Sequence, residues 1–244
     1  MAFTNFDSVL KIIKNILVLI VLCQSGISFS QPGKNIPQFD RRKFHFGFSL
    51  GGNTADFRYR FSPGVYNNDS IVNVNISKVP GFNFGIVSSW DISEVFHLRF
   101  LPSLSFQERQ FSYGVLLNNN VSTVETRLES TFLDFPLLLK LRTKRINNFA
   151  AYGLAGAQYS LDLASQADVK TAPGQRDVMK MKRHDFATQF GGGFDFFMAY
   201  YKFAVEIKIS NGFSESLIQE DIFFTSPLTS LKSKVWWFTI TFEG

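Results

Sequence analysis

The stretch Phe186–Ile209 constrains the fold of this chain most strongly, because two runs of alternating apolar and polar residues follow each other there across a short turn. In the first run phenylalanines hold one parity, and Asp195 lies on the other. In the second run Lys202, Glu206 and Lys208 share the polar parity. Successive side chains of a strand point to opposite faces, so the stretch predicts a hairpin with one apolar and one polar face. Each arm has roughly 10 residues or more, enough for a tilted strand to cross a bilayer.

Similar alternation elsewhere predicts further strands, which are Lys43–Thr54, Val79–Asp91, Val95–Gln107, Arg127–Leu141, Phe149–Leu161 and Ser233–Phe242. Long polar segments alternate with short links and predict loops at Asp56–Ser77, Glu108–Thr126, Asp162–Arg183 and Asn211–Lys232. An even strand count with short periplasmic turns and longer external loops is typical of bacterial outer-membrane barrels. We therefore predict an all-β fold, an eight-stranded antiparallel transmembrane β-barrel of the outer membrane over residues 43–244, with both termini in the periplasm. Within the fourth strand, Pro136 predicts a bulge or a local distortion.

The first residues of the chain predict a signal peptide. Two lysines precede the apolar run Ile16–Cys23, and small residues then lead to a predicted cleavage after Ser30. The run is too short to span a bilayer as a helix, which needs roughly 20 residues. We therefore predict a signal peptide over residues 1–30 and a short periplasmic lead-in over residues 31–42.

Composition restricts the classes of protein further. The only cysteine, Cys23, lies in the predicted signal peptide, so neither a disulfide framework nor thiolate chemistry is expected after cleavage. The formal net charge of +5 is small and scattered, which does not indicate nucleic-acid binding. The 29 phenylalanines exceed what a soluble domain of this size would easily bury, whereas lipid-facing strands would accommodate them. A soluble lipocalin-like barrel has the same strand count, but it would place Lys202, Glu206 and Lys208 outside.

Polar residues on the inward parity predict a hydrogen-bonded network of ion pairs in the lumen. An eight-stranded barrel is just wide enough to be filled by side chains, and an unpaired charge there is costly. The predicted members are His45, His97, Arg99, Asp134, Lys140, Asp195, Lys202, Glu206 and Lys208. The alternative use of these residues is a proton or solute path. His45 and His97 lack a third ligand in the pattern, so no metal site is predicted, and no cofactor is predicted either.

Aromatic residues near the predicted strand ends indicate the girdles that such barrels place at the two membrane interfaces. They are Phe44, Trp90, Tyr200, Tyr201, Trp236 and Phe242. No nucleophile–base motif occurs in the sequence, and we predict a protein that is not an enzyme. The long loops either bind partner proteins or lipopolysaccharide, or are solvated decoration of the barrel.

Several segments carry a family resemblance. The strand Phe132–Leu141 followed by Ala150–Tyr159 resembles small outer-membrane β-barrel families, in which L-x-x-P-L-L-L-K precedes Y-x-x-x-G. The first strand Lys43–Asn53, its basic lead-in and the closing run W-W-F-T-I-T-F-E make the chain similar to the PorT family. This resemblance implies an outer-membrane component required by the type IX secretion system, which exports gliding adhesins and proteases. The implied partners are other secretion proteins, besides lipid and lipopolysaccharide, and the alternative function is a small outer-membrane pore or solute-binding barrel.

Overall fold

The computed structural model describes residues 33–61, 71–117, 120–165, 181–218 and 228–244. The chain divides into two compact units, Met1–Lys34 and Asn35–Gly244, and all the strands described belong to the second unit. The predicted signal peptide, residues 1–30, lies outside the described residues. In the part of the chain that is described, no helix is long and apolar enough to cross a bilayer.

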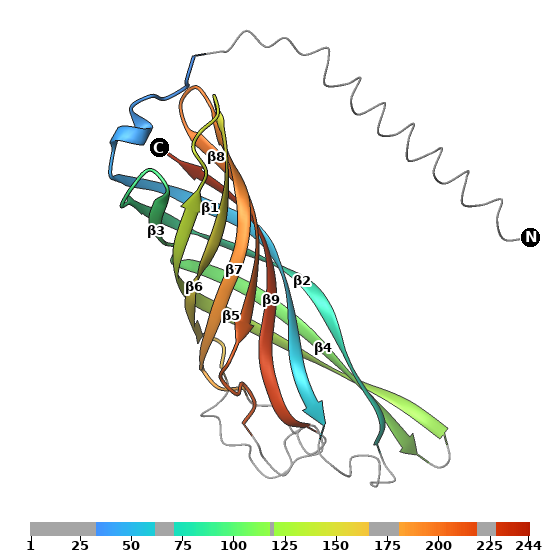
Figure 1. Cartoon of the computed structure of the whole chain (residues 1–244). Helices are drawn as coiled ribbons and strands as arrows, with labels where there is room; N and C mark the ends of the chain where they lie inside the picture. The colour runs from blue at the N-terminus through green and yellow to red at the C-terminus, as the bar shows by residue number, and fades with distance from the viewer. Residues whose placement is uncertain (1–32, 62–70, 118–119, 166–180, 219–227) are drawn as a thin grey trace, which may run out of the picture. The chain divides into compact units, whose positions relative to one another are not determined.

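The second unit is a closed ring of antiparallel strands (Figure 1). After a short 3-10 helix, η1 (Phe39–Arg41), the strands are β1 (Phe44–Phe61), β2 (Ile71–Asp91), β3 (Phe96–Phe100), β4 (Ser103–Leu117), β5 (Asn120–Arg142), β6 (Phe149–Asp162), β7 (His184–Phe197), β8 (Lys202–Gly212) and β9 (Leu228–Glu243). β1 pairs with both β2 and β9, which closes the ring. β3 and β4 share one place between β2 and β5, so the ring has eight positions. The predicted eight-stranded antiparallel barrel is confirmed.

Burial follows the predicted parity of the strands. Phe46 and Phe238 are each 62% exposed on the outer face, whereas Arg99 and Asp195 are 0% exposed inside the ring. The side chains of Lys202, Glu206 and Lys208 are also buried inside, which excludes the soluble lipocalin-like alternative. The barrel is therefore apolar outside and charged inside, as a barrel surrounded by lipid requires.

The third predicted strand, Val95–Gln107, is wrong as a continuous element, because it breaks between β3 and β4 at Leu101-Pro102. Proline cannot donate to a ladder, so a strand is easily interrupted there. Opposite the break lies Pro136 of β5, whose carbonyl accepts a hydrogen bond from the Leu101 N–H at 3.2 Å. In an antiparallel strand the N–H and C=O of one residue point to the same side. The backbone nitrogen of Pro136, which carries no hydrogen, therefore faces the break. The distortion predicted at Pro136 therefore lies in the neighbouring strand, and β5 keeps its register with β6 there.

The predicted loop Glu108–Thr126 is also wrong, because most of it is strand. β4 and β5 stay paired to their ends, through Leu117 and Asn120. β1 and β2 likewise run into the predicted loop Asp56–Ser77, and β9 begins inside the predicted loop Asn211–Lys232. At the ends of β1 and β4 the apolar residues take the inward parity, since Phe57 and Phe111 are buried. The outward apolar pattern that marks a strand in lipid is therefore lost there.

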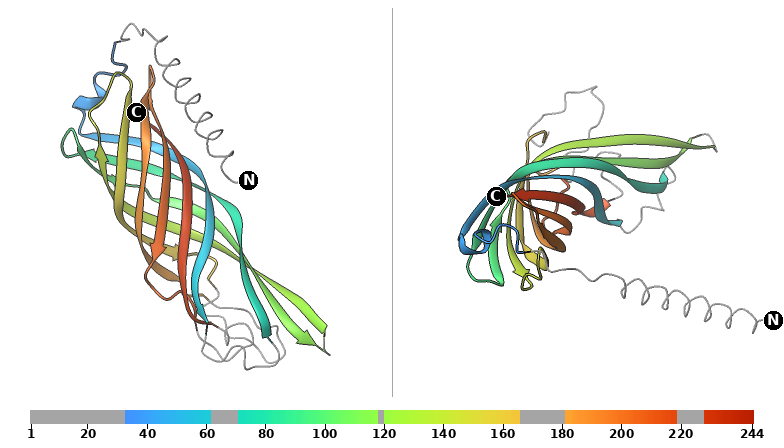
Figure 2. Two further views of the ribbon diagram at one scale, coloured as in Figure 1. Left: turned by 45° about the vertical axis from the view of Figure 1, so that its right-hand side comes forward. Right: turned by 90° about the horizontal axis from the view of Figure 1, so that it is seen from above.

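Three strand ends form a sheet that extends beyond the rest of the barrel, and we call it the projecting sheet (Figures 1 and 2). It consists of residues 71–78 of β2, 109–117 of β4 and 120–131 of β5. It lies at the end of the barrel opposite to η1 and the C-terminus (Figure 1). We call these the far end and the terminal end.

A charge on the outer face tests the lipid assignment. Phe238→Arg is expected to lower the free energy of unfolding in phospholipid vesicles by about 2–4 kcal/mol, the cost of arginine on the lipid face near the bilayer midplane. The control is Tyr200→Arg, since Tyr200 is 89% exposed on the turn between β7 and β8. Urea titration of the refolded variants gives both values. Equal losses in the two variants would contradict a lipid-facing Phe238.

Candidate functional site

The lumen contains a network of ion pairs near its terminal end. Arg99 contacts the carboxylates of Glu206 and Glu243, and its Nη2 lies 3.2 Å from Glu243 Oε1. Lys208 Nζ lies 3.0 Å from Glu206 Oε2, and Lys202 Nζ lies 2.6 Å from Glu243 Oε2. The structure thus brings Arg99, Lys202, Glu206 and Lys208 of the predicted set together. All of these side chains are at most 6% exposed.

A second pair joins this network through a tyrosine. Lys140 Nζ lies 2.8 Å from Asp195 Oδ2 and 3.6 Å from the ring centroid of Tyr152. The Tyr152 hydroxyl donates to Glu206 at 2.8 Å. Gly193 leaves room for this ring, since a Cβ there would lie 2.8 Å from the ring carbon Cζ of Tyr152.

The two lumen histidines share one carboxylate that the sequence analysis did not include. Asp91 Oδ1 lies 2.6 Å from His97 Nδ1, and Asp91 Oδ2 lies 3.3 Å from His45 Nε2. Asp91 is the last residue of β2, and it joins β1 to β3 at the terminal end.

Asp134, the last predicted member, lies apart from the ion pairs. Its carboxylate accepts hydrogen bonds from Ser105 (2.6 Å), Gln158 (2.9 Å) and Ser160 (2.5 Å). Leu138 of β5 and Leu154 of β6 lie between the Asp134 cluster and the ion pairs. They belong to a buried apolar cluster, whose other members are Val87, Leu101, Tyr152 and Ala204. The lumen is therefore filled across its width, and two cavities of about 20 Å³ are each large enough for a water molecule, which needs roughly 10–15 Å³.

Besides Asp91, sequence reasoning missed Glu243 and Arg109, which are charged and buried in the lumen. Glu243 has the inward parity of Thr239 and Thr241, but the last strand was predicted to end one residue earlier, at Phe242. Arg109 has the parity of Gln107, but it fell inside a predicted loop. The buried Arg109 donates to Gln107 at 2.8 Å, and its guanidinium lies 4.4 Å from the Phe57 ring centroid. Extending the alternation past the apolar band would have found both residues.

The described part of the predicted lead-in folds back against the terminal end of the barrel. Phe39 is 3% exposed and stacks on His45, with ring centroids 3.7 Å apart. The neighbouring Asp40 lies 3.1 Å from Arg142 Nη2 and 3.3 Å from Arg145 Nη1. Asn35 donates to the Phe197 carbonyl at 2.9 Å. Residues 35–42, which we call the mouth segment, therefore pack across the terminal end of the lumen.

Five of the six predicted interface aromatics lie near the terminal end, and one does not. Phe44 and Trp90 face each other across the β1–β2 ladder, with ring centroids 5.9 Å apart. Tyr200 and Tyr201 occupy the turn between β7 and β8, and Phe242 packs on Phe48. The sixth, Trp236, lies well inside β9, because that strand begins at Leu228 rather than at Ser233.

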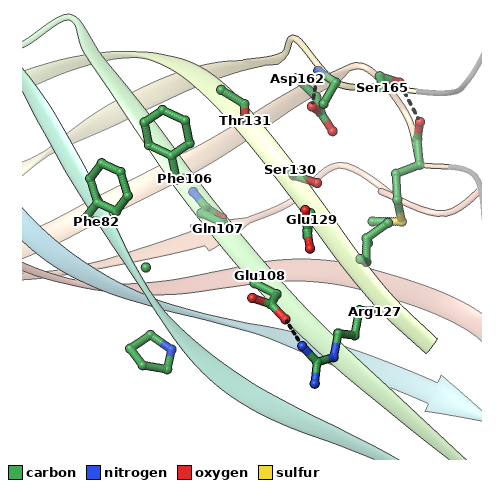
Figure 3. Close-up of a pocket in the computed structure, with 15 residues that line it drawn as sticks. Phe82, Phe106, Gln107, Glu108, Arg127, Glu129, Ser130, Thr131, Asp162 and Ser165 are labelled. Carbon is green, nitrogen blue, oxygen red and sulfur yellow. Dashed lines mark hydrogen bonds and ion pairs between the residues drawn. The ribbon is translucent and has the colours of Figure 1, made fainter. Parts of the chain in front are cut away.

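A larger cavity, of about 580 Å³, lies where the projecting sheet leaves the barrel (Figure 3). β2, β4 and β5 contribute Pro80, Gly81, Phe82, Phe106, Gln107, Glu108 and 127–131. The end of β6 and the residues after it contribute Asp162, Ala164 and Ser165, and the residues before β7 contribute Met181. Arg127 Nη1 lies 3.7 Å from Glu108 Oε1 across the floor of this cavity. Charged and apolar groups both line it, and two of its residues, Arg127 and Glu129, are exposed to solvent.

The sequence model of one protein family matches most of the chain. The family is described as "Outer membrane protein beta-barrel domain", and the match covers residues 29–217. No curated protein matches the chain. Several solved structures are similar to the chain at low identity, and they include the following two.

The first is Ail, the attachment invasion locus protein of Yersinia pestis, in complex with the heparin analogue sucrose octasulfate. It has 10% identity, a TM-score of 0.37, and the match covers 83% of this chain and 100% of Ail. The second is the outer membrane protein OprG from Pseudomonas aeruginosa. It has 15% identity, a TM-score of 0.45, and the match covers 87% of this chain and 97% of OprG. Identities this low do not indicate a shared ligand or activity.

Removing one carboxylate tests the ion-pair network. Glu206→Leu is expected to lower the free energy of unfolding by about 3–5 kcal/mol, because Arg99 and Lys208 lose their shared partner inside the barrel. The matched control is Glu94→Leu on the exposed turn between β2 and β3, expected to change it by about 0.5 kcal/mol or less. Adding Arg99→Met to Glu206→Leu should recover part of the loss. Equal effects of the two single substitutions would contradict the network.

Loss of the Phe39 ring tests the docking of the mouth segment. Phe39→Ala is expected to raise the rate of trypsin cleavage after Arg41 and Arg42 at least tenfold, since truncating a buried phenylalanine costs about 3–5 kcal/mol. Phe44→Ala is the control, because Phe44 faces outward. Mass spectrometry locates the cuts, and heat-dependent gel mobility shows that the barrel is folded. Equal cleavage of the two variants would mean that Phe39 does not hold the segment.

Proposed function

The chain belongs to the outer membrane protein beta-barrel domain family, and on that premise we propose that it serves protein secretion as a docking component of the outer membrane. Its site of action is the outer membrane. It works through its two exposed ends and without enzymatic chemistry.

The filled lumen is the observation that carries this proposal. Ion pairs, the buried residues Leu138 and Leu154, and the Asp134 cluster succeed each other along the barrel axis. The mouth segment then packs across the terminal end with Phe39. A barrel filled in this way offers no wide aqueous route, which speaks against the small pore or solute-binding barrel. Its two ends remain as the surfaces on which other molecules can act.

The finer assignment rests on the resemblance of the sequence to the PorT family. We propose that the barrel assists the assembly or operation of a type IX secretion apparatus, which exports adhesins for gliding and proteases. Its partners are other secretion proteins, besides the lipid and lipopolysaccharide around it. Both termini then face the periplasm, and the projecting sheet faces the exterior. This orientation follows the short links of the terminal end, such as the turn between β7 and β8.

Deletion of the gene tests the secretion role. The deletion strain is expected to lose export of secreted adhesins and proteases, while a periplasmic marker stays inside the cells. Complementation with the wild-type chain should restore export. A tag for recovery of partners belongs after Gly244, which is exposed, because the mouth segment is engaged by the barrel.

Two outcomes would contradict the proposal. Normal export in the deletion strain would remove the secretion role. Stable single-channel conductance of the purified barrel in planar bilayers, with recovery of no other protein through the tag, would favour the pore.

A further inference from the structure

Among the described residues, one edge of the projecting sheet has no neighbouring strand. The pairing of β5 with β6 begins at Phe132 opposite Asp162, where β6 ends. One further hydrogen bond joins them, from the Leu163 N–H to the Thr131 carbonyl at 2.8 Å. Within the described ranges, residues 120–130 of β5 pair on one side only, with β4.

The backbone groups that face this edge can be assigned. In an antiparallel strand the N–H and C=O of one residue point to the same side, and the side alternates along the strand. Because the Thr131 carbonyl faces the edge, the N–H and C=O groups of Glu129, Arg127 and Glu125 face it too. Such a row of donors and acceptors is a template on which another strand can pair.

The edge borders open space. Residues 127–131 line the cavity of about 580 Å³ (Figure 3), together with Asp162, Ser165 and Met181. Ser165 donates to the Met181 carbonyl at 3.1 Å, which ties the two parts of that wall together.

The charges along the edge indicate the character of its occupant. Glu108 and Glu129 are directly opposite each other in the β4–β5 ladder, an arrangement that destabilises a sheet when nothing neutralises it. Arg127 lies beside Glu108, but its own side chain is 65% exposed. Glu129 is exposed, and Asp162 lines the same cavity. The buried Asp162 already accepts a hydrogen bond from the Ala164 N–H at 2.9 Å, so it is not counted among the available charges. The two carboxylates of Glu108 and Glu129 against one guanidinium favour a cationic occupant.

A second copy of the chain is a poorer fit. The other edge of the projecting sheet, residues 71–78 of β2, offers only Lys78 as a cation. Lys78 is already paired with Asp56, at 3.1 Å. Two β5 edges facing each other would bring further glutamates together.

We propose that the edge of β5 between Glu125 and Thr131 is a docking site for an extended, basic segment of a partner protein, which adds to the sheet as a further strand. Backbone hydrogen bonds to Glu125, Arg127 and Glu129 provide the affinity. Lysine or arginine side chains of the segment pair with the exposed Glu129. The inference goes beyond the proposed secretion role, because it holds whether or not the partner belongs to a secretion apparatus.

Two synthetic decapeptides test the site, one alternating lysine with valine and one alternating glutamate with valine. Fluorescence anisotropy with the folded barrel in detergent measures binding. The lysine peptide is expected to bind at least tenfold more tightly than the glutamate peptide. Glu129→Lys should weaken binding of the lysine peptide at least tenfold. Equal binding of the two peptides, or no effect of Glu129→Lys, would overturn the charge assignment.

A pair of substitutions at Arg127 separates the contribution of the backbone hydrogen bond to peptide binding from that of the side-chain charge. Arg127→Pro removes the edge-directed N–H without removing a donor from the β4 ladder, and Arg127→Gln removes only the charge. The lysine peptide should bind the glutamine variant at least as well as wild type, and the proline variant several-fold more weakly. Equal binding to both variants would exclude strand addition.

Hydrogen exchange provides a check that needs no variant. The lysine peptide should slow amide exchange at Glu125, Arg127 and Glu129 more than at Thr126 and Leu128, whose N–H groups already face β4. Unchanged exchange at the three edge positions would overturn the proposal. Light scattering gives the molar mass of the purified barrel. A doubled mass that the lysine peptide lowers to that of one chain would also overturn the proposal, because the occupant of the edge would then be a second copy.

Discussion

The closure of β1 on β9 is the constraint from which the rest of the structure follows. Their ladder runs from Gly47 opposite Glu243 to Phe61 opposite Leu228, and it joins the first strand of the chain to the last. In lipid there is no water to satisfy a backbone N–H or C=O, so a sheet that spans a membrane cannot keep a free edge. Once the ring is closed, each spanning strand must turn one face to hydrocarbon. The charged residues of the chain are then confined to the inner face and to the two ends.

Closure at eight positions also determines which side chains the lumen can contain. The interior of so small a ring has no room for bulk water, so four cationic side chains, Arg99, Lys140, Lys202 and Lys208, share it with Asp195, Glu206 and Glu243. Each carboxylate contacts at least one cation, and Glu206 also accepts from a tyrosine. The network is thus the way in which a narrow polar lumen avoids isolated charge. It ties β3 and β5 to β7, β8 and β9 across the barrel, from the inside.

The sequence predicted the fold well wherever one face of a strand meets lipid. Period-two alternation identified the hairpin Phe186–Ile209 and the lumen residues that belong to it, such as Asp195 and Glu206. It failed for β4 and β5 beyond Glu108, although their ladder continues. In β4 the apolar residues move there to the inward parity, where Phe111 and Tyr113 are buried, and the outward apolar pattern is lost. The partner of each lumen charge could not be read from the sequence either. Arg99 reaches Glu243 across the ring, and such contacts depend on barrel diameter and strand tilt rather than on any local pattern.

The mouth segment connects the part of the chain before β1 to the completion of folding. It precedes β1 directly, yet its contacts reach Arg142, Asn148 and Phe197, which lie more than 100 residues further along the chain. The slot for Phe39 is built from β1 and β7, and the cations that hold Asp40 come from the end of β5 and the turn after it. None of these surfaces is complete until most of the ring has assembled. The segment that precedes every strand therefore docks late in folding, and a docked Phe39 marks a barrel whose strands have come together.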